Sequence, residues 1–108
     1  MKELKFYEVL EGEIGGSGWI REVNTSIREA EKAARHYRKN TSCEEVLVVK
    51  NVLKFENLAD LSEAKELLNS IKNKCWPSER IVYEISELAD DFDPMFDSEV
   101  ILSFLVKR

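Results

Sequence analysis

The segment that most constrains the fold of this chain is residues 45–55, which read EVLVVKNVLKF. It contains an unbroken apolar run over residues 46–49, it is rich in β-branched side chains, and neither Gly nor Pro interrupts it. This pattern is typical of a strand that is buried on both faces of a sheet. Lys50 and Asn51 leave one alternative open, because they could form a turn between two shorter strands, as in a ferredoxin-like fold. We favour one long strand.

Two amphipathic helical patterns flank this central strand. The first covers residues 26–39, where Ser26 and Glu29 have the spacing of a capping box. The second covers residues 60–73 and ends before Pro77, which cannot continue a helix. Each pattern carries a single apolar stripe, so each helix is expected to pack on the sheet.

Four further segments have the apolar periodicity of strands. Residues 4–10 and 19–23 flank a Gly-rich turn and are predicted to form a hairpin, while residues 80–86 and 100–106 follow the second helix. The last segment is apolar on both faces, so we expect it to be interior to the sheet. The sequence therefore predicts one α+β domain over residues 1–108, in the order ββαβαββ. In this two-layer sandwich, a mostly antiparallel sheet of about five strands has two helices packed on one face.

Composition and charge argue against several classes of function. The net charge is −5 and the acidic excess lies in residues 57–108, which makes the chain a poor non-specific ligand for nucleic acid or an anionic membrane. Its two cysteines and single histidine lack the spacing of a metal site, so we predict no metal and no cofactor. The chain shows no signal-peptide pattern and no apolar run near the roughly 20 residues of a membrane span, so a cytoplasmic location without membrane contact is expected.

The predicted connection over residues 87–99 combines acidic and aromatic side chains. It contains six acids and no base, with Phe92, Met95 and Phe96 between them. Long connections often carry function. Here the acids could steer a basic protein partner while the aromatic residues anchor it. The predicted partner-binding residues are Asp90, Asp91, Phe92, Asp93, Phe96 and Asp97.

Two other interpretations of this connection compete with docking. In the first, which is the commonest explanation for such a segment, the aromatic residues plug the edge of the core and the acids solvate the loop. In the second, the carboxylates bind a divalent cation. The segment lacks the ligand spacing and the glycine of an EF-hand, so the cation site ranks last.

The first predicted helix also carries a basic stripe. Arg28, Lys32, Arg35 and Lys39 recur at helical spacing, on the side away from the apolar residues. Such a row is usually a solvated helix face, and as a functional surface it would bind the phosphates of nucleic acid. The stripe and the acidic connection could also meet between copies, which predicts a homo-oligomer held partly by charge.

The sequence contains no recognisable catalytic constellation, since it has one histidine and neither a nucleophile elbow nor a triad pattern. The leading hypothesis is therefore a small non-catalytic protein-binding or regulatory module that acts through its acidic and aromatic loop. Nucleic-acid binding through the basic stripe is the alternative. A small enzyme of unrecognised type, working with carboxylates alone, is a third.

Overall fold

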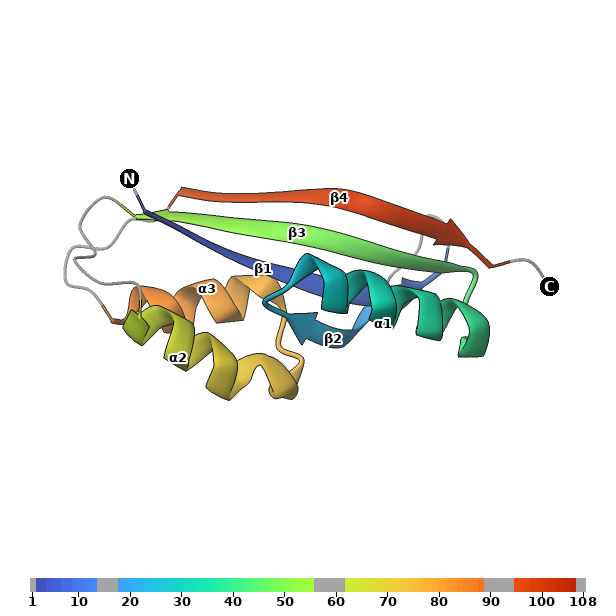
Figure 1. Ribbon diagram of the computed structural model, residues 1–108, viewed down its shortest axis with the longest axis horizontal. Helices are drawn as coiled ribbons and strands as arrows, with labels where there is room; N and C mark the ends of the chain where they lie inside the picture. Colours follow the sequence, from blue (N-terminus) through green and yellow to red (C-terminus); the bar gives the residue numbers. More distant parts are fainter. Residues whose placement is uncertain (1, 14–17, 56–61, 89–94, 107–108) are drawn as a thin grey trace.

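A computed structural model describes residues 2–13, 18–55, 62–88 and 95–106 of the chain (Figure 1). The described elements, in chain order, are β1 (Lys2–Gly12), β2 (Gly18–Asn24), α1 (Ile27–Asn40), β3 (Glu45–Phe55), α2 (Ser62–Ile71), the short 3-10 helix η1 (Lys72–Lys74), α3 (Ser78–Ser86) and β4 (Met95–Leu105). The strands β1, β3 and β4 are long and nearly aligned, and they run along the longest axis of the molecule (Figure 1).

The described strands form one antiparallel sheet in the order β2-β1-β3-β4. This confirms the α+β class, although the sheet has four strands and the described chain has three α-helices, where about five strands and two helices were predicted. β3 lies inside the sheet and is continuous through Lys50 and Asn51, which confirms the single long strand. The expected hairpin is present as β1 and β2.

The helices cover opposite faces of the sheet. Ala30 and Ala34 of α1 pack against a cluster that includes Tyr7, Val9, Val46 and Val48, which we call the α1 face. The second cluster joins α2 and α3 to residues of the other face, namely Leu4, Phe6 and Leu53, which we call the α2–α3 face. Successive strand residues point to opposite sides of a sheet. The expected arrangement, with both helices on one face, is therefore wrong. In Figure 1, α1 lies near one end of the strands, and α2 and α3 lie near the other.

The segment over residues 80–86, predicted as a strand, is helix α3. Ile81 and Ile85 are buried while Tyr83, which the strand pattern placed beside them, is 61% exposed. The error has a simple cause: residues four apart share a face in a helix as well as in a strand. Pro77 immediately before the helix is consistent with a helix start, where a missing N–H costs nothing.

The last strand differs from the prediction in its position and its length. β4 begins at Met95, so residues 95–99 belong to a strand and not to a loop, and β4 lies at the edge of the sheet and not in its interior. Its pairing with β3 shifts by one residue between Val48 and Val49. Because of this bulge, Ile101 and Leu102 both pack on the core of the α1 face. The bulge explains why the sequence looks apolar on both faces.

The helix boundaries are close to those predicted, but the expected capping box is absent. Ser26 has the extended backbone of a residue that precedes a helix, and its side chain makes no capping hydrogen bond. Its carbonyl oxygen accepts the first helical bond, from the Ala30 N–H at 3.1 Å. α2 runs from Ser62 to Ile71, and residues 60–61 of the predicted helix lie outside the described residues.

Candidate interaction surface on the edge strand

β4 has one paired side and one open side. It pairs with β3, and no other strand in the described part of the chain pairs with it. Val106, directly after β4, donates its N–H to the Glu44 carbonyl at 2.8 Å. In an antiparallel pair, alternate residues direct their backbone groups toward the neighbouring strand and away from it. Leu105 and Ser103 therefore direct their N–H and C=O groups to the open side.

The same alternation can be followed through the bulge. β3 pairs with β1 without any register shift, so its backbone groups alternate regularly along its whole length. The backbone N–H and C=O groups of Lys50, Val52 and Lys54 consequently face β4. The backbone groups of their partners, which are Glu99, Asp97 and Met95, face β3 in return. The residues between those partners point outward. The outward set, which we call the free edge, is Phe96, Ser98, Val100, Ser103 and Leu105.

Apolar side chains are exposed along this strand. Met95 is 57%, Val100 56% and Leu105 57% exposed, and together they are half of the six large apolar side chains that are exposed in the described residues. Natural edge strands are commonly protected by lysine or proline, and β4 contains neither. Its charged residues are Asp97 and Glu99. They repel an acidic strand, but they do not repel a neutral or basic one.

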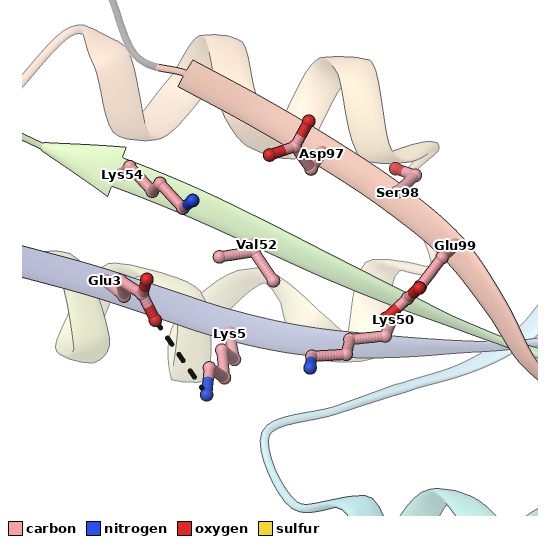
Figure 2. Close-up of a pocket in the computed structure, with 8 residues that line it drawn as sticks. All are labelled: Glu3, Lys5, Lys50, Val52, Lys54, Asp97, Ser98 and Glu99. Carbon is pink, nitrogen blue, oxygen red and sulfur yellow. Dashed lines mark ion pairs between the residues drawn. The ribbon is translucent and has the colours of Figure 1, made fainter.

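A polar groove lies on the α1 face of the sheet, beyond α1 itself. It has a volume of about 500 Å³ and brings together lysines and carboxylates from three strands, and these residues are Glu3, Lys5, Lys50, Lys54, Asp97 and Glu99 (Figure 2). Lys5 Nζ lies 3.9 Å from a Glu3 carboxylate oxygen, and both side chains are nearly half exposed. Exposed pairs of this kind contribute little free energy. The mixed charge gives the groove no clear preference for an anionic or a cationic small ligand.

A second hollow, which we call the basic pocket, lies where α1 meets the end of β4. It has a volume of about 450 Å³, and its walls are Arg35, Arg38, Lys39, Phe104 and Val106. The Arg38 guanidinium lies 4.8 Å from the centre of the Phe104 ring. This contact fixes a cation beside β4. Arg38 is not part of the predicted basic stripe, and only the packing of α1 against the sheet brings it to this place.

Two consecutive hydrogen bonds fasten the middle of β4 to the interior of the sheet. Ser98 Oγ donates to Asn51 Oδ1 at 2.6 Å, and Asn51 Nδ2 donates to Glu8 Oε1 at 2.8 Å. Asn51 is fully buried and Glu8 nearly so. Burial raises the pKa of Glu8 above its ordinary value of 4.5, the Asn51 amide opposes the rise, and the nearby Glu79 charge adds to it. The Asn51 amide cannot relay a proton, so Glu8 does not activate the Ser98 hydroxyl. These hydrogen bonds therefore serve as a structural link.

The predicted docking residues are only partly within the described chain. Asp90, Asp91, Phe92 and Asp93 lie outside the described residues. Phe96 is half-buried against the core of the α2–α3 face, while Asp97 is exposed and lines the polar groove. The sequence placed Phe96 and Asp97 in a loop, and the structure places them on the edge strand.

The four residues of the predicted basic stripe, Arg28, Lys32, Arg35 and Lys39, are all exposed on α1. None forms an ion pair within 4 Å among the described residues. Arg35 and Lys39 line the basic pocket, whereas Lys32 lies in a separate shallow hollow with Glu22, Glu29 and His36. The stripe therefore divides into two differently surrounded parts.

In the described residues, no group of three or more His, Cys, Asp or Glu side chains is placed to hold a metal ion. No described helix combines the length and the apolar character that a bilayer span requires. No protein-family model, no curated protein and no solved structure matches this chain significantly.

Proposed function

We propose that this chain is a non-catalytic protein-binding module whose binding surface is the free edge of β4 together with the acidic and aromatic residues around its start. The observation that carries the proposal is an eleven-residue edge strand that has exposed apolar side chains at three positions and lacks lysine and proline. Such an edge is a template for an incoming strand.

Binding would take the form of strand addition. The outward N–H and C=O groups of the free edge supply backbone hydrogen bonds, and the side chains of alternate residues supply specificity. The carboxylates near the start of the strand would steer a basic partner toward it. Asp97 is the described member of this group, and Asp90, Asp91 and Asp93 precede it in the sequence. Phe92 and Phe96 complete the proposed binding residues.

The test is affinity capture from native lysate with the immobilised chain, with and without nuclease, followed by mass spectrometry. A variant in which Asp90, Asp91, Asp93 and Asp97 are changed to Asn should lose its protein partners, because it loses the steering charge while keeping the core. A variant in which Arg28 and Lys32, the two stripe residues that do not line the basic pocket, are changed to Gln is the matched control and should keep its partners. Protein capture that is identical for the wild type and the four-Asp variant would contradict the proposal.

Nucleic-acid binding through α1 is a second candidate, and the exposure of all four stripe residues without an ion pair in the described chain favours it. It predicts capture that nuclease abolishes and that the stripe control removes. It also predicts an affinity that falls steeply with salt concentration, since counterions are released from the phosphates on binding. The net charge of −5 opposes this candidate.

A further inference from the structure

We infer that the partner at the free edge is a second copy of this chain, and that β4 of the two protomers pairs antiparallel about a two-fold axis at Val100. The inference rests on the proposed function, because it names the partner that the edge strand binds. The register of the strand and the charges on either side of Val100 support it.

The outward backbone groups match under this symmetry. With Val100 opposite the partner's Val100, Ser98 lies opposite the partner's Ser103, and Phe96 lies opposite the partner's Leu105. The step from Val100 to Ser103 contains one residue more than the step from Val100 to Ser98. The bulge absorbs this difference, because the residues from Val100 to Ser103 span the same length as Val49 to Leu47 of β3. All the paired residues belong to the free edge, so each can exchange hydrogen bonds.

The side chains match on the α2–α3 face. Opposite residues of an antiparallel pair point to the same face. The exposed Val100 side chains of the two protomers therefore meet at the axis, and the exposed Leu105 meets the partner's Phe96. Two of the three exposed apolar residues of β4 lose contact with water in this way.

The charges match on the α1 face. Asp97 lies opposite the partner's Phe104. In each protomer the Arg38 guanidinium stacks over the Phe104 ring, so Asp97 comes close to the partner's Arg38. Met95, the third exposed apolar residue, lies opposite the partner's Val106. Phe104 and Val106 are the apolar walls of the basic pocket, and Arg35 and Lys39 stand beside them. The acidic first half of β4 therefore meets the basic pocket of the partner, and the two-fold symmetry forms this contact twice.

The charges also select this orientation over a parallel one. In a parallel pair in register, Asp97 would lie beside the partner's Asp97 and Glu99 beside the partner's Glu99, and like charges in such positions repel. The antiparallel pair separates these acids and satisfies the two-fold symmetry that closes a dimer. We expect a weak dimer, with a micromolar dissociation constant, because one strand edge buries less surface than a standard interface.

The test is sedimentation equilibrium of the purified chain at low and high salt. The wild type should dimerise at low salt and dissociate more readily at high salt, since part of the attraction is electrostatic. Asp97→Arg and Arg38→Asp should each weaken self-association by roughly tenfold or more, because each puts like charges at both symmetric contacts. The double variant should restore it. Glu66→Arg, which reverses an exposed charge on α2, is the matched control and should dimerise like the wild type.

The outcomes separate this inference from the proposed function. A chain that stays monomeric at high concentration and low salt overturns the inference, and so does a dimer that neither single variant weakens. If a monomeric chain still captures a different protein and loses it in the four-Asp variant, the inference fails and the proposed function stands. Thermal unfolding of each variant identifies any that fails to fold, and Val100→Lys then replaces it, because Val100 is exposed in the single chain and meets its own copy in the dimer.

Discussion

At the scale of single residues, the unusual feature of this chain is a carboxyl group in the interior of the sheet. Glu8 shares its strand face with Phe6 and Leu4, and its carboxyl group accepts a hydrogen bond from the Asn51 amide. A buried carboxyl of this kind resists ionisation. Asn51 also accepts a hydrogen bond from the Ser98 hydroxyl. The Glu8 carboxyl, whose burial costs stability, is therefore linked through Asn51 to the edge strand.

The raised pKa of Glu8 predicts a particular pH dependence of stability. Below the ordinary value of 4.5 the carboxyl is protonated in the folded and unfolded chains alike, and its contribution to stability is fully present. As the pH rises above 4.5 the unfolded chain ionises first, so the free energy of unfolding should fall until the folded group has also ionised. Glu8→Gln should remove this fall, because an amide keeps an acceptor for Asn51 and carries no charge. Urea unfolding between pH 4 and pH 8 measures it.

The exposed Glu3 of the same strand provides the control for this experiment. Glu3→Gln removes a charge without changing the interior, so its stability should follow the pH dependence of the wild type. A Glu8→Gln chain that loses stability with rising pH as steeply as the wild type would show that the buried carboxyl is not the cause.

At the scale of elements, a helix or strand is predicted correctly where its apolar pattern is typical of one type of secondary structure. The β-branched run of β3 fits only a buried strand, and the apolar stripe of α1 fits only a packed helix. The spacing of Ile81 and Ile85 fits both a helix and a strand, so α3 could not be recognised from its own residues. Packing decides between the two, because α3 lies beside α2 over the α2–α3 face.

The candidate surface was predictable to a smaller extent. The acidic and aromatic composition before residue 100 is visible in the sequence, and it is the reason that Phe96 and Asp97 are predicted as binding residues. The register shift at Val48 and Val49 has no sequence signal, and it decides which residues of β4 face outward. Arg38 could not be identified either, because its role depends on where α1 crosses the end of β4.

The helical state of α3 predicts which of its side chains matter for stability. Ile81→Ala should lower the free energy of unfolding by about 2 to 5 kcal/mol, since it leaves a cavity in the core. Tyr83→Ala should change the free energy by no more than about 0.5 kcal/mol, because that side chain is mostly in water. Chemical denaturation of the two variants measures both values. Comparable losses at the two positions would instead support a strand with Ile81 and Tyr83 on one inward face.

At the scale of the whole molecule, charge and exposed backbone are arranged along one long strand. β4 begins with exposed acidic and apolar residues and ends beside a basic pocket, and its outer side is open along its full length in the described structure. Antiparallel pairing of two such strands brings the acidic start of each β4 to the basic pocket at the end of the partner's β4. We therefore propose the edge strand as the place where this chain meets a second copy of itself.

Disulfide trapping at the two-fold axis tests this claim most directly. In a background with Cys75→Ser, which removes the half-exposed native thiol, Val100→Cys is compared with Leu105→Cys. The two positions are equally exposed in the single chain, at 56% and 57%. Residues that exchange hydrogen bonds across an antiparallel pair lie about 5.5 Å apart at Cα, which is within the range of a disulfide. Under mild oxidation we expect a rapid covalent dimer for Val100→Cys and none for Leu105→Cys, which lies far from its own copy in the proposed dimer. Equal trapping at the two positions, or none at Val100→Cys, would contradict it.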